Sequence, residues 1–392
     1  MTTDQSDPEQ RLVELTDRLL AENDPTDRTA FLGAQFDAGL AFVHFPDGAG
    51  GLGLAPKLQK VVDERIVAAG GPARAGDIGH GMAAPTIAAC GTPEQRGRWL
   101  RPLFTREEVW CQMFSEPGAG SDVAGLATRA VRDGDEWVVN GQKVWTSLAH
   151  ASRWGLLLAR TDPEAAKHKG MTYFVIDLHQ PGVEVRPLRQ LTGQAEFNEV
   201  YFTDALVADA DRLGDVGDGW RVALTTLMNE RVSIGGGVRE RGEGTIEWAL
   251  DAWRAGNGAD PVMRDRLVRL WVEAEVLRLT NMRAAAARKA GTPGPEGSVG
   301  KLFSAELNQR ITELAVTLMG PAGMTYDEGY DLDPERFHNY RSAQGWFLRS
   351  RANSIEGGTS EIMRNILGER VLGLPGDLRV DKDRAWSDIP RS

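Results

Sequence analysis

The spacing of apolar residues changes twice along the chain. Up to about residue 108, apolar side chains recur at helical intervals in residues 11–22 and again in residues 58–69, which predicts amphipathic helices. A further helix is predicted from Pro93 to about Leu100, because Thr92 is a suitable N-cap and Gln95 completes a capping box. The start of the chain is therefore predicted to be helical with breaks.

From residue 110 to about 202 the apolar period falls to two. Short strands are predicted over residues 136–139, 154–158, 171–176 and 200–202. Helical spacing returns after residue 219, with long helices predicted over residues 220–253, 261–290, 300–318 and 360–372. This order predicts an α+β fold, mainly α, with domains at 1–109, 110–214 and 215–392.

Composition narrows the class of protein. The 392 residues are 41% hydrophobic and 26% charged, as in a soluble globular protein. The net charge of −11 argues against a nucleic-acid partner but leaves room for a small anionic ligand at local arginines and helix N-termini. Only Cys90 and Cys111 are present and the N-terminus is acidic and polar, so we expect a cytoplasmic location. No apolar run approaches 18 residues, so we expect no membrane span.

Two segments carry candidate chemistry. Residues 114–125 read FSEPGAGSDVAG, a turn-rich loop whose small residues expose backbone N–H groups and hydroxyls suited to phosphates or a polar heterocycle. Residues 140–147 read NGQKVWTS, which we interpret as a strand-turn-strand with Asn140-Gly141 at the bend. A planar aromatic cofactor could stack near Trp145 while a hydroxyl of Thr146 or Ser147 bonds its ring edge.

Together the two segments closely resemble the flavin and substrate signature of the acyl-CoA dehydrogenase family. The resemblance covers essentially the whole chain and implies an N-terminal helical domain, a small β-barrel-like domain and a C-terminal four-helix bundle. It also implies FAD, an acyl-CoA substrate oxidised to a trans-2-enoyl-CoA, and electron transfer to an electron-transferring flavoprotein.

The resemblance assigns roles residue by residue. It places Phe114, Ser115, Gly120 and Ser121 at the FAD and the thioester, and Trp145, Thr146 and Ser147 around the isoalloxazine, with Ser147 replacing a threonine. Near the C-terminus, residues at the start of the last predicted helix would approach the flavin or its phosphates: Gly357, Gly358, Thr359 and Glu361. The acyl-CoA would contact Ser121, Asn229 and Arg231.

Two carboxylates are candidates for the base that removes the α-proton. Helical spacing puts Glu230 on one face with Ala223, Leu227, Ile234 and Gly237, and such an apolar face raises a carboxyl pKa. Its Glu-Arg pair matches the position at which isovaleryl and long-chain relatives keep the base. Most relatives instead keep it in the later Gly-Thr turn, where this chain has Gly357 and places Glu356 one residue too early. We therefore expect Glu230, with Glu356 as the alternative.

A base on the bundle helix occurs in relatives that take branched, long or bulky acyl groups, and we lean to such a substrate. The chain departs from the family where an Arg-x-x-Phe-Gly segment would bind the FAD of a neighbouring subunit, because residues 253–261 lack it. We therefore expect either a homotetramer or a mixed tetramer with a related chain. In the second case the chain could be a structural, FAD-supporting subunit.

A remoter alternative is an NAD-dependent dehydrogenase. Residues 48–53 read GAGGLG, which fits the spelling of a dinucleotide fingerprint. The context fails, because Pro46-Asp47 separate the apolar run from the glycines and no second strand ends in an acidic residue about twenty positions on. The six histidines show no metal-ligand spacing with cysteines or carboxylates, so we expect no metal.

Overall fold

The computed structural model describes residues 7–234, 239–256, 260–290, 294–326, 340–376, 381 and 383–390. The side chains of residues 230–234, 288, 289 and 296 lie outside this description. The chain divides into two compact units, one of residues 1–186, 197–230 and 381–392 and one of residues 187–196 and 231–380. Each unit is described by itself.

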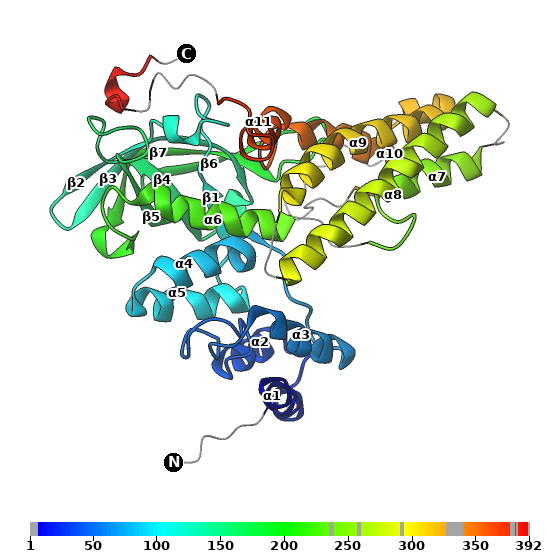
Figure 1. The fold of residues 1–392 in the computed structure, drawn as a ribbon. Coiled ribbons are helices and arrows are strands. Elements are labelled where there is room, and N and C mark those ends of the chain that lie inside the picture. The colour runs from blue at the N-terminus through cyan, green and yellow to red at the C-terminus, as the bar shows by residue number, and fades with distance from the viewer. Residues whose placement is uncertain are drawn as a thin grey trace. The chain divides into compact units, whose positions relative to one another are not determined.

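The first unit begins with short helices (Figure 1). They are α1 (Pro8–Glu22), α2 (Arg28–Asp37), α3 (Gln59–Ala68), α4 (Ala84–Cys90) and α5 (Pro93–Thr105). The predicted capping box is confirmed, because Gln95 N–H donates to Thr92 Oγ1 at 3.3 Å and Thr92 N–H donates to Gln95 Oε1 at 2.9 Å. The helix extends beyond the predicted end to Thr105.

The glycine-rich stretch at residues 48–53 is a turn between α2 and α3. Residues 40–45 before it are turns and bends, not a strand, and no helix begins directly after Gly53. An added Cβ at Gly51 would lie 2.2 Å from the Phe45 carbonyl oxygen, so close backbone packing accounts for that glycine. The strand-glycine-helix context of a dinucleotide site is therefore absent from these described residues.

An eight-stranded sheet follows in the order β6-β7-β3-β2-β4-β5-β8, with β1 pairing in parallel with β4. The strands are β1 (Trp110–Met113), β2 (Arg129–Asp133), β3 (Glu136–Ser147), β4 (Trp154–Arg160), β5 (Met171–Asp177), β6 (Val183–Leu188), β7 (Phe197–Ala208) and β8 (Arg212–Leu213). Side chains of β4 alternate between two cores, with Leu156 and Leu158 in one and Leu157 in the other. The predicted strands are confirmed.

The predicted bend at Asn140-Gly141 is wrong. β3 runs unbroken through both residues, and the reversal between β2 and β3 lies at Gly134, whose φ is +60°. The pairing register with β7 shifts between Val139 and Gly141, so the Asn-Gly pair makes a β-bulge. A Cβ on Gly141 would lie 2.5 Å from Thr128 Oγ1, which explains the glycine there.

A single helix over residues 220–253 is also wrong. α6 spans Gly219–Ile234 and α7 spans Thr245–Ala255. Between them, Gly242 and Gly244 adopt φ values of +83° and +92°, which a right-handed helix does not allow. Within the first unit α6 packs Val222 and Ala223 into the core that it shares with β4 and β5.

The second unit contains α7, α8 (Pro261–Lys289), α9 (Glu296–Leu318), α10 (Ala343–Ser350) and α11 (Ser360–Arg370). Helices α7 to α10 share a core that includes Leu267, Leu270, Leu307, Ile311 and Leu314. α9 packs against α7, α8, α10 and α11, so it is the central helix of this unit (Figure 1). The predicted α+β order of helices, sheet and helices is confirmed, while the three domain boundaries remain predictions.

Among the described helices, none combines the length and apolar character needed to cross a membrane.

Candidate functional site

A buried ion pair braces the loop that follows β1. Lys143 Nζ lies 2.8 Å from Glu116 Oε1 and also donates to the Phe114 carbonyl oxygen at 3.0 Å. The Lys143 side chain is fully buried and that of Glu116 is 7% exposed. Glu116 also accepts from the N–H groups of Ala127 at 2.6 Å and Thr128 at 2.9 Å. One carboxylate thus ties both ends of the loop to β3.

The charge balance of this pair favours the ionised carboxylate. Burial raises the pKa of Glu116, but the Lys143 ammonium and the donated hydrogen bonds outweigh it, so the net pKa lies below the usual range. Both oxygens of this buried carboxylate therefore accept from a donor. The loop is therefore held by Glu116 without using the exposed residues between Pro117 and Ser121.

The loop offers backbone donors at its tip. Gly120 and Ser121 are exposed, and in this described stretch their N–H groups donate to no protein acceptor. Successive free N–H groups in a turn form a concave site for an anion. Ser115 is half-buried and its carbonyl oxygen accepts from Val144 N–H at 2.9 Å, which joins the start of the loop to β3.

The end of β3 presents Trp145 in an unusual conformation. Its φ is +59°, its side chain is 61% exposed, and the register of β3 against β7 shifts between Lys143 and Thr146. A bulky residue with positive φ stores strain, and such strain is frequent at ligand sites. The indole packs edge-on against Phe197, with ring centroids 6.1 Å apart. This contact fixes the orientation of an otherwise exposed aromatic ring.

Thr146 and Ser147 follow as a buried and a half-buried hydroxyl. Thr146 Oγ1 is buried and has no hydrogen-bond partner in the described protein. A buried hydroxyl without a partner indicates a missing ligand atom or water. These residues fit the polar edge and the flat face of a flavin.

Phe114 connects this loop to α6. Its side chain is 4% exposed and meets Tyr173 edge-on at 5.8 Å, so it packs in the core, and its place at the FAD stays a prediction. Tyr173 Oη lies 2.9 Å from Thr226 Oγ1, which lies 3.0 Å from Thr86 Oγ1. Contacts therefore run continuously from the loop to the middle of α6.

Glu230 lies one helical turn after Thr226. Val222, Ala223 and Thr226, earlier in the same helix, are fully buried. Asn229 Nδ2 donates to the Thr225 carbonyl oxygen at 2.9 Å. The side chains of Glu230, Arg231 and Ile234, and all of Gly237, lie outside the described residues.

Glu356, the alternative base, is held in an ion pair within the second unit. Arg349 binds both of its carboxylate oxygens, at 3.0 and 2.6 Å, and Asn353 Nδ2 donates to Oε1 at 2.8 Å. The Arg349 side chain is only 9% exposed, so this carboxylate gives a largely buried guanidinium a bidentate anionic partner. Glu356 is thus engaged by Arg349 and Asn353, and its role as the alternative base stays a prediction.

The turn before α11 is shaped by two glycines. Gly357 and Gly358 have φ values of +59° and +96°, and Thr359 caps the helix by accepting from Ile362 N–H at 3.1 Å. Ser360 Oγ is buried and has no partner among the described residues. Glu361 is exposed and lies 3.5 Å from Arg364. Binding of an anion at this helix start stays a prediction.

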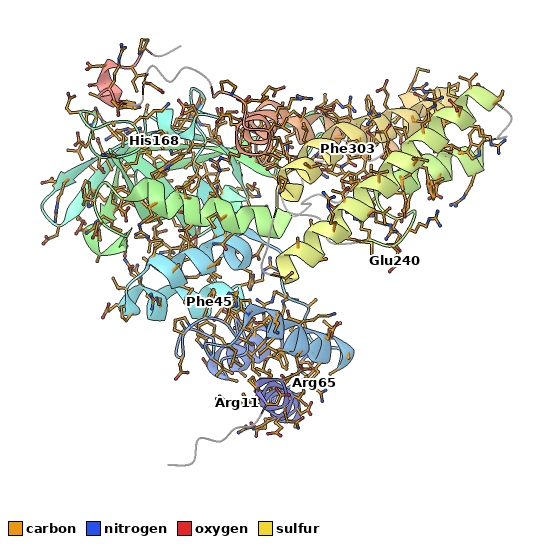
Figure 2. The ribbon with its side chains drawn as sticks, in the orientation of Figure 1. Arg11, Phe45, Arg65, His168, Glu240 and Phe303 are labelled. Carbon is orange, nitrogen blue, oxygen red and sulfur yellow. The ribbon has the colours of Figure 1, made fainter. Side chains whose placement is uncertain are left out.

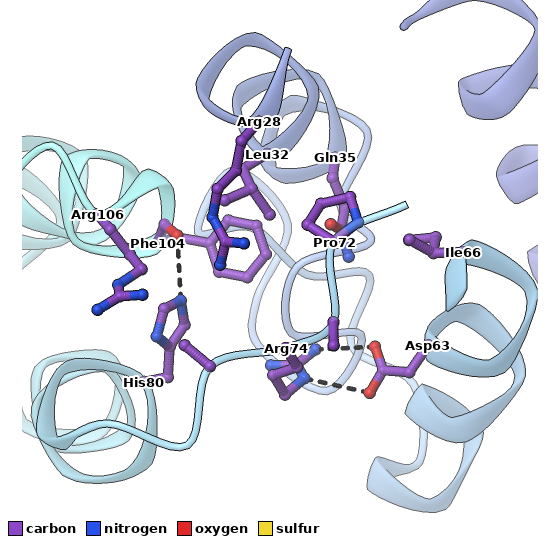
Figure 3. A pocket seen from close by; sticks show the side chains of 12 residues that line it. Arg28, Leu32, Gln35, Asp63, Ile66, Pro72, Arg74, His80, Phe104 and Arg106 are labelled. Atoms are coloured by element: carbon purple, nitrogen blue, oxygen red, sulfur yellow. Dashed lines mark hydrogen bonds and ion pairs between the residues drawn. The ribbon is translucent and has the colours of Figure 1, made fainter. Parts of the chain in front are cut away.

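A separate small pocket lies among the N-terminal helices (Figure 3). Part of its polar lining is paired within the protein, because Arg74 binds Asp63 and His80 Nε2 lies 3.0 Å from the Phe104 carbonyl oxygen. In the part of the chain that the structure describes, no group of three or more histidines, cysteines or carboxylates could hold a metal ion.

Comparison with known proteins defines the class. The acyl-CoA dehydrogenase N-terminal domain matches residues 10–107, the middle domain matches 111–205 and the C-terminal domain matches 217–372. The chain therefore belongs to the acyl-CoA dehydrogenase family. Members of this family are FAD-dependent oxidoreductases that act on a CH–CH bond and pass electrons to an electron-transferring flavoprotein.

Several relatives are similar over most of the chain. Acyl-CoA dehydrogenase IpdE1 of Mycobacterium tuberculosis is 41% identical, covering 87% of this chain and 86% of the relative. The human mitochondrial short-chain specific acyl-CoA dehydrogenase is 28% identical, covering 85% and 80%.

Two solved structures are also similar. The Tcur3481-Tcur3483 steroid acyl-CoA dehydrogenase has a TM-score of 0.71 at 25% identity, covering 96% of this chain and 100% of the other. The ChsE4-ChsE5 complex of Mycobacterium tuberculosis has a TM-score of 0.68 at 26% identity, covering 96% and 100%.

Sequence reasoning missed three residues that organise these segments: Glu116, Lys143 and Arg349. Lys143 gave only a weak signal: it lies in a predicted strand beside Val144, and a lysine whose side chain is buried there needs a partner. The partner itself could not be predicted, since it lies 27 residues away in a loop.

Proposed function

We propose that this chain catalyses FAD-dependent α,β-dehydrogenation of an acyl-CoA thioester to a trans-2-enoyl-CoA, with electrons leaving through an electron-transferring flavoprotein. The observation that supports it most is the braced loop beside an exposed, strained Trp145 and a partnerless Thr146 hydroxyl. These features come together at β1 and β3 and suit a flat heterocycle with a polar edge.

Each residue has a distinct task in this proposal. Glu230 accepts the α-proton, Trp145 covers the flavin face, and Thr146 and Ser147 bond its edge. Gly120 and Ser121 supply donors to the anionic part of the ligands, as do Gly357, Gly358 and Thr359. Bound FAD supplies the hydride acceptor for the β-carbon. Asn229 and Arg231 are assigned to the acyl-CoA.

We further propose a branched, long or bulky acyl group. The likeness to a protein described as a steroid acyl-CoA dehydrogenase adds to the argument from a base on the bundle helix. A panel of saturated acyl-CoAs, from short straight chains to branched and ring-bearing ones, tests this. A clear preference for butyryl-CoA contradicts it.

A second candidate is a chain that works only in a mixed assembly. Two similar structures are of the paired chains Tcur3481-Tcur3483 and ChsE4-ChsE5, and this chain lacks the Arg-x-x-Phe-Gly segment. In this case it would be the FAD-supporting half of a mixed tetramer with a related chain. The suitable residues at Trp145, Ser147 and Glu230 favour the catalytic role.

The direct test of the proposal is spectroscopic. We expect the purified protein to be yellow, and an acyl-CoA added without oxygen to bleach its flavin absorbance. The control is the same addition of free CoA, which has no acyl chain to oxidise. A colourless protein that binds no FAD, alone or with a partner chain, refutes the proposal.

A further inference from the structure

The end of the chain returns to the first unit. Residues 381 and 383–390 belong to that unit, although the helices before them belong to the second. They lie beyond residues 217–372, which the C-terminal family domain matches. Trp386, which is buried, is the only aromatic residue after Phe347. We call residues 381–390 the C-terminal tail.

The tail lies along the loop between β4 and β5, which Figure 2 marks by His168. Ala385 forms a bridge with Ala166, Trp386 N–H donates to the Ala165 carbonyl oxygen at 2.9 Å, and Ser387 N–H donates to that of Pro163 at 2.9 Å. Lys167 forms an ion pair with Asp381. Backbone and charge both hold the tail in this position.

Trp386 touches the far end of the candidate ligand loop. Its Nε1–H donates to the Gly125 carbonyl oxygen at 3.3 Å, and its side chain is 7% exposed. The Arg160 guanidinium lies over the indole at 4.7 Å from the ring centroid. The tryptophan thus fills the space between the loop and a buried arginine.

The same arginine and lysine also hold the loop directly. Arg160 Nη2 donates to the Ala124 carbonyl oxygen at 2.6 Å, and Arg160 Nη1 donates to that of Lys167 at 2.7 Å. Lys167 Nζ lies 3.1 Å from both carboxylate oxygens of Asp122. Residues 122–125 are therefore held by groups that all contact the tail, and Ser121 comes immediately before them.

We propose that Trp386 is a positioning residue, through which the C-terminal tail fixes the turn at Val123–Gly125 and so holds Gly120 and Ser121 in the conformation that binds FAD and acyl-CoA. The proposal rests on the proposed function for the identity of those ligands. Whether the tail stabilises the loop does not depend on the identity of those ligands, so it can be tested in protein without any ligand.

Hydrogen exchange in the ligand-free protein measures how strongly the tail stabilises the loop. The amides of Gly125 and Leu126 donate within the turn, to Asp122 and Val123 carbonyl oxygens at 2.9 and 3.1 Å. We expect Trp386→Ala to speed their exchange about tenfold, because it removes a cation–π contact and a hydrogen bond. Trp386→Phe keeps an aromatic ring under Arg160, so the exchange rates of these amides should stay closer to those of the unaltered protein. This variant replaces Trp386→Ala in the test if the alanine variant does not fold.

Trp137→Ala is the matched control. Trp137 is also buried in the sheet, but its Nε1–H donates to Asp209 at 2.8 Å and its ring lies near Arg132, and neither of these partners belongs to the tail. It should lower the melting temperature without selectively speeding exchange at Gly125 and Leu126. Ser387→Ala, at an exposed side chain of the tail, should change neither.

Binding measurements complete the test. Trp386→Ala should raise the FAD dissociation constant or the acyl-CoA KM about five- to tenfold while kcat at saturation changes less than twofold. Unchanged loop exchange in Trp386→Ala, or equal acceleration in Trp137→Ala, overturns the inference. So do unchanged FAD affinity and KM in a variant whose loop has loosened. If the unaltered protein binds no flavin, the proposed function fails, whereas the exchange result still decides whether the tail holds the loop.

Discussion

Trp145 combines a left-handed backbone with a side chain that is 61% exposed, so the fold gains little from its burial. We therefore predict that Trp145→Ala weakens FAD binding by about 1 kcal/mol or more and leaves the free energy of unfolding nearly unchanged. Flavin content after dialysis and chemical denaturation measure the two effects. Val131→Ala, at a 57% exposed residue of β2, is the control. Unchanged flavin content and spectrum in Trp145→Ala would make the indole a surface residue without a role.

Among the residues that hold the loop after β1, Lys143 is the one whose substitution should lower the unfolding free energy most. Lys143→Met leaves the Glu116 carboxylate buried without its cation, which should cost about 3–5 kcal/mol of unfolding free energy at neutral pH. Lys60→Met is the control, because the Lys60–Glu64 pair is exposed and should contribute under about 1 kcal/mol. Chemical denaturation measures both.

The cost of Lys143→Met should depend on pH. In the unaltered protein the lowered pKa of Glu116 means that its contribution is complete above its usual pKa of 4.5 and is lost as pH falls through the lower folded value. Without Lys143, burial raises that pKa instead, so protonation relieves the buried charge and the variant gains stability as pH falls from 8 towards 5. The difference in unfolding free energy between the unaltered protein and Lys143→Met should therefore become smaller as the pH falls. A gap that is constant across this range contradicts the assigned role of the pair.

At the scale of elements, the β-bulge at Gly141 positions the end of β3. Gly141→Ala would place a Cβ 2.7 Å from Thr128 Cα, and we predict a loss of about 1–3 kcal/mol in unfolding free energy. Gly97→Ala is the matched substitution, because Gly97 is exposed within α5 and has nothing within 4 Å of an added Cβ. It should raise stability by roughly 0.5–1 kcal/mol. Equal effects of the two changes would count against the bulge.

Local patterns predicted the elements whose signals are local. The capping box at Thr92 and the short apolar run of β4 needed no tertiary information. The bend predicted at Asn140-Gly141 was wrong because an Asn-Gly pair suits both a hairpin turn and a β-bulge. Only the contact of Gly141 with Thr128 decides between the two. The candidate ligand segments were predicted from their motifs, whereas the Glu116–Lys143 brace and the Trp386 contact depend on residues that meet only after folding.

At the scale of the whole molecule, the open question is whether one kind of chain suffices. α8 carries exposed apolar side chains at helical spacing, namely Val268, Val272, Val276 and Leu279. We predict a tetramer with near one FAD per chain when the protein is expressed alone, as measured by light scattering and flavin absorbance. Flavin-free, unstable protein that a co-expressed related chain rescues would instead support the mixed assembly.

The central claim is that Glu230 removes the α-proton beside a flavin. The most direct measurement is the rate at which a saturating acyl-CoA bleaches the flavin without oxygen, compared among the unaltered protein, Glu230→Gln and Glu356→Gln. We predict that Glu230→Gln binds FAD normally but bleaches roughly 10²–10⁴-fold more slowly. Glu356→Gln should bleach at a near-normal rate and lose roughly 1–3 kcal/mol of stability, because Arg349 loses its carboxylate. Rapid bleaching in Glu230→Gln together with none in Glu356→Gln would contradict the account.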